Sequence, residues 1–387
     1  MKYASIIPLA GGMTLGAMKT LGGYPEYIFS WSDFKNNDKQ LLNYFDKKNI
    51  KYNYHVIDKD ILKEKIYGID IVTGVPPCGG LSMFNSSNNK SCNSRGPNAK
   101  QNDWMYKAAN YVLEVIKPKV YIFENAPNLY SKIGEPVIEK LNKIAEEFGY
   151  STSIVKTSTH LHGIPQKRSR SFFYFWDSLY APFVKYYNKK TNDLATYLNE
   201  NVNDNSDIIL YDNLEQDPTL KFLKEDVYWG DISKLRYNMK NGNIKSGIDY
   251  IEKYKFEEDY LKWCKKTNNK KGLKFIERVM RKRKDGKSYW NDSFIYYHTY
   301  TNAIIAKTLY RILHPVEDRF LNKGEIISLM GHPKDYTELK NINMITQNVP
   351  VNTAADWINE ARKFVKGELL ISTQKFLKQN NIKQKVE

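Results

Sequence analysis

Short apolar runs alternate along the chain with amphipathic stretches, and this pattern predicts the fold class. The runs that we interpret as buried strands cover residues 4–9, 27–30, 55–57, 70–75, 120–123, 152–156 and 171–175. Between several of these runs, apolar side chains recur at helical spacing, as in residues 38–49, 104–116 and 137–148. Such alternation is typical of an α/β protein with a doubly wound, mainly parallel sheet, whose site lies at the carboxyl ends of the strands.

The run at residues 70–75 is followed by Pro76, Pro77 and Cys78. Two prolines fix φ and remove backbone donors, so the chain must leave the sheet there as a stiff loop. This loop would display the thiol of Cys78 as a candidate nucleophile. A lone cysteine is more often a small buried apolar residue, and the rest of the chain must decide between the two interpretations.

Two further strand ends carry polar side chains. The run at residues 120–123 leads to Glu124 and Asn125, and Arg168 and Arg170 alternate just before the run at residues 171–175. Glu124 is either a solvated loop charge or a proton-handling group beside the thiol loop. The two arginines share one face of an extended segment. They are either surface cations or a fork that grips a base oxygen, a phosphate or a nearby carboxylate.

The first apolar run breaks at Ala10, Gly11 and Gly12, and a helical pattern follows. A turn of this kind brings backbone amides and a helix amino end against a ligand. Glycine turns between strands and helices are also common in proteins that bind nothing there, so this motif alone is weak evidence for a site.

The regular alternation stops between about residues 176 and 289, where Lys, Asn, Asp and aromatic residues dominate. We therefore expect a catalytic domain at residues 1–176, a smaller irregular domain at residues 177–290, and a return segment at residues 291–387 that completes the first domain. The middle domain contains the run Arg281, Lys282, Arg283 and Lys284, which is either a solvated patch or a set of phosphate contacts.

The return segment predicts three helices, at residues 303–312, 323–330 and 353–365. Asn322 precedes the second of these helices, and Glu325 follows three positions later. This spacing predicts a capping box.

The chain of 387 residues has 59 Lys and Arg against 43 Asp and Glu, a formal net charge of +16. This excess favours a polyanionic partner, with nucleic acid as the first candidate, although a nucleotide-biased genome would account for part of the Lys and Asn content. The cysteines Cys78, Cys92 and Cys264 have neither the spacing of a disulfide framework nor that of a metal site. With no leader or membrane-spanning run in the sequence, we expect a protein without metal in the cytoplasm of a bacterium or a virus-infected cell.

Taken in order, these motifs make the chain similar to the DNA cytosine carbon-5 methyltransferases, outside the variable middle. The matching pieces are residues 10–12, Asp60 with Ile61, residues 70–78 with Ser82, residues 117–125, residues 163–170, residues 319–325, residues 329–333, and Val349 with Pro350. Each piece is weak alone, but the ordered set is specific. The resemblance implies a Rossmann-like methyltransferase sheet with a target-recognition domain in the middle.

The resemblance also implies a mechanism. Cys78 would add to carbon 6 of a cytosine flipped out of DNA, and a protonated Glu124 would hold ring nitrogen 3. Arg170 would hold the base oxygen, Arg168 would hold nearby acidic and phosphate groups, and Asn125 would brace the loop. Carbon 5 would then be alkylated by S-adenosylmethionine.

The implied partners are this methyl donor and double-stranded DNA, and we expect a monomer that modifies DNA as a restriction partner, a solitary modifier or a viral self-protection enzyme. The donor-binding candidates are Leu9, Ala10, Gly11, Gly12, Trp31, Asp60, Ile61, Pro76, Asn348 and Val349. The DNA-binding candidates are Ser82, Arg281, Lys282, Arg283 and Lys284.

The sequence departs from the family pattern mainly on the donor side. Ser5 and Ile7 stand where the family usually has an acidic residue and Phe, and Trp31 stands where the family has the acid that binds the donor ribose. Gly79 replaces the usual Gln after the nucleophile, and residues 346–348 replace the usual Gly-Asn-Ala. These departures leave open an enzyme with an altered one-carbon donor. Two alternatives of other classes are a DNA-binding homologue without catalysis and an enzyme that acts on free deoxycytidine monophosphate.

Overall fold

The computed structural model of the chain describes residues 1–60, 66–82, 96–202, 217–286, 293–306, 308–336 and 342–369. The chain divides into two compact units. Unit 1 contains Met1–Thr191 and Leu329–Glu387, and unit 2 contains Asn192–Ser328. Each unit has its own hydrophobic core.

Unit 1 is built on a sheet whose described strands lie in the order β3-β2-β1-β4-β5-β8-β6. The strands are β1 (Tyr3–Ile6), β2 (Tyr27–Ser30), β3 (Asn53–Val56), β4 (Ile71–Gly74), β5 (Val120–Asn125), β6 (Ser151–Ser158) and β8 (Ser169–Trp176). From β3 to β5 the neighbours pair in parallel, whereas β8 pairs antiparallel with both β5 and β6. The predicted mainly parallel, doubly wound sheet is confirmed.

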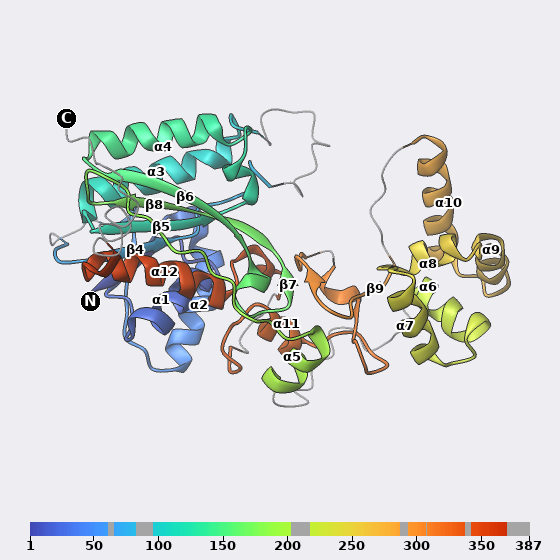
Figure 1. The fold of residues 1–387 in the computed structure, drawn as a ribbon. Helices are drawn as coiled ribbons and strands as arrows, with labels where there is room; N and C mark the ends of the chain where they lie inside the picture. Colours follow the sequence, from blue (N-terminus) through green and yellow to red (C-terminus); the bar gives the residue numbers. More distant parts are fainter. Residues whose placement is uncertain are drawn as a thin grey trace, which may run out of the picture. The chain divides into compact units, whose positions relative to one another are not determined.

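Helices cover both faces of this sheet, with α3 and α4 on one side and α1 and α12 on the other (Figure 1). The helices of unit 1 are α1 (Gly12–Leu21), α2 (Lys35–Lys47), α3 (Asp103–Tyr111), α4 (Glu135–Glu147) and α12 (Val351–Val365). Short helical turns are η1 (Ser32–Phe34), η2 (Lys100–Asn102), η3 (Val112–Ile116), η4 (Pro127–Tyr130), η5 (Thr159–Leu161) and η9 (Ile342–Gln347), and β7 is Gln166–Lys167. The predicted helix at residues 104–116 is formed by α3 and η3, and it ends where Lys117 takes φ 52° before Pro118.

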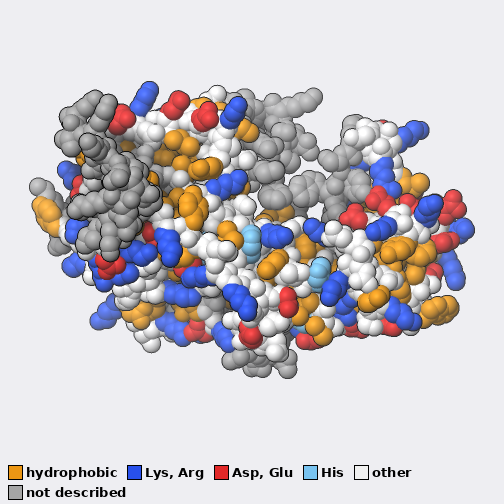
Figure 2. Space-filling model, in the orientation of Figure 1, with side chains coloured by type: hydrophobic (Ala, Val, Ile, Leu, Met, Phe, Trp, Pro, Cys, Tyr) orange, Lys and Arg blue, Asp and Glu red, His pale blue; other side chains and the backbone are white. Residues whose placement is uncertain are grey.

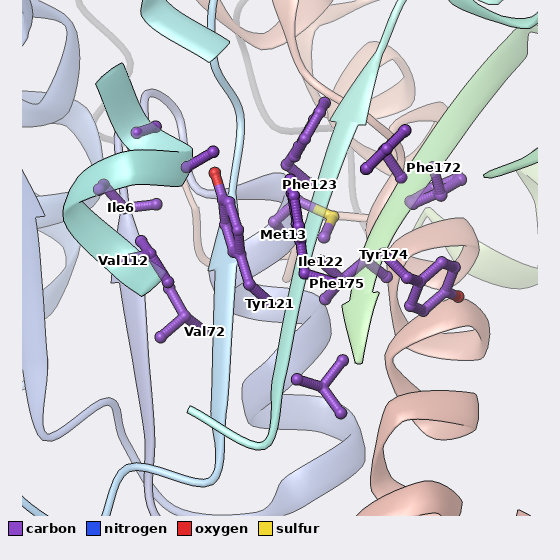
Figure 3. Close-up of a cluster of buried hydrophobic side chains, with 14 of the residues drawn as sticks. Ile6, Met13, Val72, Val112, Tyr121, Ile122, Phe123, Phe172, Tyr174 and Phe175 are labelled. Atoms are coloured by element: carbon purple, nitrogen blue, oxygen red, sulfur yellow. The ribbon is translucent and has the colours of Figure 1, made fainter. Parts of the chain in front are cut away.

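Aromatic residues of β5 and β8 lie in the core cluster, among them Tyr121, Phe123 and Phe175 in Figure 3. Tyr121 stacks on Phe175 and Phe123 stacks on Phe173, each with ring centroids 5.4 Å apart. The members of each pair lie directly opposite each other in the antiparallel register. Such cross-strand pairs stabilise a sheet, so β5 is a rigid support for the polar residues at its end.

The first strand is shorter than predicted. β1 ends at Ile6, because Ile7 and Leu9 have φ values of 48° and 51° and cannot continue a strand. Both side chains are buried, although the left-handed backbone region is unfavourable for residues with a Cβ. The apolar residues after β1 therefore belong to the glycine turn.

Unit 2 is mostly helical. Its helices are α5 (Leu194–Asn201), α6 (Pro218–Phe222), η7 (Leu223–Val227), α7 (Ile232–Asn241), α8 (Gly247–Lys253), α9 (Glu257–Lys266) and α10 (Lys270–Lys284). Its other elements are β9 (Ile295–Tyr296), β10 (Thr301–Asn302), η8 (Leu309–Arg311) and β11 (Ile312–Leu313), and α11 (Lys323–Leu329) ends at the boundary with unit 1. The expected irregular segment thus contains helices, because its aromatic side chains, such as Phe222, Tyr260 and Trp263, pack into a helical core.

Two predictions about the return segment had different outcomes. The predicted helix at residues 303–312 was wrong within the described part of that segment, because Ile312 and Leu313 pair in parallel with Ile295 and Tyr296 instead. The capping box is confirmed: the Asn322 side chain accepts the Glu325 N–H at 2.8 Å, and Glu325 accepts the Asn322 N–H at 2.7 Å.

Lys and Arg side chains are spread over the face of the molecule drawn in Figure 2 and do not gather in a single patch. Within the described ranges, no helix has the length and apolar character needed to cross a bilayer. The same residues contain no group of three or more His, Cys, Asp or Glu side chains that could hold a metal ion. Cys92 lies outside the described residues.

Candidate active site

The loop after β4 carries Cys78. Val75 and Pro76 are buried, whereas Cys78 is only partly buried against the core. The N–H of Leu81 donates to the Cys78 carbonyl at 3.1 Å, and the Asn125 Nδ2 donates to the Pro76 carbonyl at 3.2 Å. Asn125 at the end of β5 therefore braces the stiff loop.

Glu124 and Arg170 form a buried ion pair beside this loop. β4 is the parallel neighbour of β5, and β8 is its antiparallel neighbour, so the end of β5 meets both the Cys78 loop and the start of β8. The Arg170 Nε lies 2.5 Å from the Glu124 Oε1. The sheet thus gathers a thiol, a carboxyl group and a guanidinium from three strand ends.

Arg168 lies beside the segment that precedes α12. Its side chain is fully buried and donates to the carbonyl oxygens of Thr346 and Asn348, the latter at 2.7 Å. Arg170 is the arginine that forms the ion pair with Glu124. Arg168 thus fastens the segment before α12 to the sheet, and its charge also lowers the pKa of Glu124. Its role toward acidic and phosphate groups stays a prediction.

Burial and neighbouring charges set the protonation of the site. Burial raises the pKa of Glu124, and the attraction of Arg170 and then Arg168 only partly offsets this effect. Burial, followed by the charge of Glu124, also raises the pKa of the Cys78 thiol, whereas Arg170 and Arg168 lower it. Burial thus shifts Glu124 toward its neutral form, and loss of the charge on Glu124 would lower the pKa of the Cys78 thiol.

The glycine turn is held by groups that the sequence did not single out. The Leu9 N–H donates to Asp38 Oδ1 at 3.0 Å, and Tyr54 donates to the other oxygen of this buried carboxylate at 3.0 Å. Burial raises the pKa of Asp38 to about 6. The sequence could have indicated this buried carboxylate, because Asp38 lies at helical spacing from Leu41 and Phe45 and so shares the apolar face of α2 with them.

A second set of contacts fixes the carbonyl of Ala10 in the same turn. Tyr336 donates its hydroxyl hydrogen to this oxygen at 2.8 Å, and the His332 Nε2 lies 3.2 Å from it. Burial lowers the pKa of His332 to about 4, so this imidazole is neutral at pH 7. A neutral His332 can donate one N–H to the Ala10 carbonyl.

Asn348 and Val349 lie against the start of α1. The Gly12 N–H donates to the Asn348 Oδ1 at 3.1 Å, and a Cβ on Gly12 would collide with the carbonyl oxygen of Val349. The Asn348 Nδ2 is buried and has no hydrogen-bond partner within the described residues. An unpartnered buried donor at a glycine turn is a candidate ligand contact.

The remaining donor-side candidates lie at the ends of β2 and β3. Trp31 is buried and packs edge-on against Trp104, with centroids 5.5 Å apart. Asp60 accepts the Val56 N–H at 2.6 Å, and Ile61 lies outside the described residues. At the position of the usual family acid, Ser5 instead bonds to Thr14 and lies 3.2 Å from the Thr73 hydroxyl.

The DNA-binding candidates lie in two places. Ser82 is the last described residue after the Cys78 loop. The other four form the last turn of α10, where Arg281 and Lys284 are exposed and Arg283 pairs with Glu252. Arg283 is thus engaged within unit 2, whereas its exposed neighbours face solvent.

A comparison with protein families agrees with the site. The model of the C-5 cytosine-specific DNA methylases matches residues 1–362 of this chain. Among curated proteins, the chain is similar to the type II methyltransferase M.AgeI of Thalassovita gelatinovora, with 27% identity over 106 residues that cover 27% of this chain and 23% of that protein. It is also similar to the type II methyltransferase M1.HphI of Haemophilus parahaemolyticus, with 22% identity over 173 residues that cover 44% of each protein. The matched parts thus span less than half of these curated relatives.

Solved structures share the fold. A prophage-encoded E. coli protein, described as a DNA modification methyltransferase, superimposes with a TM-score of 0.54 at 15% identity. The alignment covers 95% of this chain and 100% of that one. At this identity the similarity establishes the fold alone.

Proposed function

Because the chain belongs to the C-5 cytosine-specific DNA methylase family, we propose that it is an enzyme that methylates carbon 5 of cytosine in double-stranded DNA. The observation that carries this proposal is the grouping of Cys78, Glu124 and Arg170 at adjoining strand ends. A thiol, a carboxyl group of raised pKa and a guanidinium together suit nucleophilic attack on a pyrimidine ring.

In this mechanism the Cys78 thiolate forms a bond to carbon 6 of a cytosine that has been flipped out of the duplex. Protonated Glu124 donates a hydrogen bond to ring nitrogen 3, where negative charge develops, and Arg170 keeps the carboxyl group in position. The addition makes carbon 5 nucleophilic. After carbon 5 has been alkylated, a base removes its proton, the electrons re-form the ring double bond, and the bond from carbon 6 to the Cys78 sulfur breaks.

The donor side would bind a ligand that carries a hydrogen-bond acceptor, such as the carboxylate of an amino acid. The buried Asn348 Nδ2, which lacks a partner within the described part of the chain, would donate to such a group beside Gly12. Trp31 and Asp60, at neighbouring strand ends, would hold the nucleoside part. S-adenosylmethionine would supply an electrophilic methyl group on sulfur when it is bound there.

Unit 2 would contact the DNA. Its residues 217–286 contain 19 Lys and Arg against 11 Asp and Glu, and the exposed Arg281 and Lys284 end α10. Cations of this kind would contribute salt-dependent phosphate contacts. We further propose that the protein acts as a monomer in the cytoplasm.

The test is the mass of nucleosides from DNA incubated with the protein, with and without S-adenosylmethionine. We expect a methyl increment on cytosine that requires the donor and disappears in Cys78→Ser. Any other increment would reject a methyl product in favour of an altered donor.

Trapping on DNA that contains 5-fluorocytosine tests the nucleophile separately. If the DNA stays unmodified and no covalent complex forms, the protein would be a DNA-binding homologue without catalysis. Modification of free deoxycytidine monophosphate, but not of DNA, would reject the DNA substrate.

A further inference from the structure

Two glycines directly after the nucleophile lie beneath two amide side chains of η2. A Cβ on Gly79 would lie 2.7 Å from the Cδ of Gln101, and a Cβ on Gly80 would lie 3.1 Å from the Cγ of Asn102. Contacts this short leave no room for an ordinary side chain at either position unless the amide moves. The glycines therefore let η2 pack directly on the backbone of the Cys78 loop.

The two amides have different surroundings. Asn102 is buried and donates through Nδ2 to the carbonyls of Gly96 and Pro97, at 3.0 and 2.9 Å. The Gly96 N–H in turn donates to the Gly80 carbonyl at 2.8 Å. Asn102 thus fastens two segments together, and its loss would disturb folding.

Gln101, in contrast, is exposed, and its carboxamide occupies the space that a side chain at position 79 would fill. We infer that Gln101 supplies the carboxamide that contacts the DNA strand beside the target cytosine, from the position next to Cys78. A carboxamide suits this role because it can donate to a phosphate or base oxygen and also accept from a base N–H. The inference rests on the proposed function, because the contacted strand is the one that carries the cytosine.

The position of Gln101 predicts a specific pattern among variants. Gln101→Ala should lower the rate of covalent trapping on 5-fluorocytosine DNA, or raise KM for DNA, by about ten-fold, the effect of one lost hydrogen bond to a charged or polar substrate group. Gly79→Ala should cause a similar loss, because the new methyl group displaces the flexible end of Gln101. The double variant should be no worse than either single variant, since both remove the same contact.

A swap variant tests whether the carboxamide itself matters. Gly79→Gln combined with Gln101→Ala moves the amide to the other side of the same space, and it should recover most of the trapping rate. The matched control is Asn98→Ala, which removes an exposed amide three residues earlier and should leave trapping and thermal unfolding unchanged.

Two outcomes would overturn the inference: full activity of Gln101→Ala, or losses in the two single variants that multiply in the double variant. The wild-type protein, measured in the same assays, distinguishes failure of the Gln101 role from failure of the proposed function. If the wild type neither modifies nor traps DNA, the proposed function fails and the role of Gln101 fails with it. If the wild type is active and Gln101→Ala is equally active, only the role of Gln101 fails.

Discussion

The Arg170 Nε lies 2.5 Å from the Glu124 Oε1, in an ion pair whose side chains are 14% and 3% exposed. The pair forms because β8 starts beside the point where β5 ends, so two residues 46 positions apart in the sequence meet at one edge of the sheet. Burial raises the pKa of Glu124, and Arg170 opposes this effect. Arg170 therefore adjusts the acidity of Glu124 as well as its position.

Replacing this guanidinium should shift the pH dependence of the enzyme. If protonated Glu124 is required, the trapping rate falls as the pH rises through the pKa of Glu124. Arg170→Met removes the charge that lowers this pKa, so the falling limb should move to higher pH. The measurement is the pH profile of trapping on 5-fluorocytosine DNA. Glu124→Gln serves as the control, because it should be slow and lack this limb; an unshifted limb in Arg170→Met would contradict the assignment.

Removing the buried Arg168 should destabilise the protein. Arg168→Met leaves the carbonyls of Thr346 and Asn348 without their donor, and the expected cost is about 2–4 kcal/mol in the free energy of unfolding. Chemical unfolding measures this loss. Lys167→Met is the matched control, because Lys167 is exposed and its replacement should cost far less. Equal stability of the two variants would show that the buried contacts of Arg168 contribute little.

Asp38 should give the protein a pH-dependent loss of stability. Burial raises its folded-state pKa from 3.8 to about 6, so the protonated carboxyl group is favoured in the folded protein. The stabilisation from protonated Asp38 is therefore fully present below pH 4 and is lost as the pH rises through 6. Asp38→Asn removes this dependence, and its stability relative to wild type should improve by up to about 3 kcal/mol between pH 4 and pH 7. Unfolding curves at both pH values test this; a constant difference would mean that Asp38 is ionised throughout.

Glu325 should have the opposite dependence. Burial opposes its ionisation, but hydrogen bonds from Arg319 and His314 outweigh burial and lower its pKa from 4.5 to about 2. The stabilisation is therefore present above pH 4.5 and is lost as the pH falls through 2. At pH 7, Glu325→Gln should cost about 3 kcal/mol of unfolding free energy, and less at pH 3.5.

A neighbouring acid provides the control for Glu325. Glu317 also pairs with Arg319, at 2.7 Å, but its side chain is 59% exposed. Glu317→Gln should therefore cost less than about 1 kcal/mol. If both variants lose the same amount in chemical unfolding, the effect comes from the net charge of unit 2 and not from the buried pair.

The sequence by itself determined where most strands lie, the doubly wound and mainly parallel class of the sheet, the capping box of Asn322 and Glu325, and the strand ends that carry Cys78, Glu124 and Arg170. These features follow from local properties: the period of apolar residues, the φ restriction of proline, and the capping preferences of Asn322 and Glu325. They depend on neighbours within a few positions, so they can be predicted from a single sequence.

Tertiary structure alone decided which distant groups meet. The sequence placed Arg168 and Arg170 on one face of an extended segment. Only the packing of the segment before α12 buries Arg168 against the carbonyls of Thr346 and Asn348. Arg170 pairs with Glu124 instead. The contacts of Asp38 with Leu9 and of Gln101 with Gly79 have the same origin. Such pairs depend on the three-dimensional path of the chain, and the local spacing of residues does not record that path.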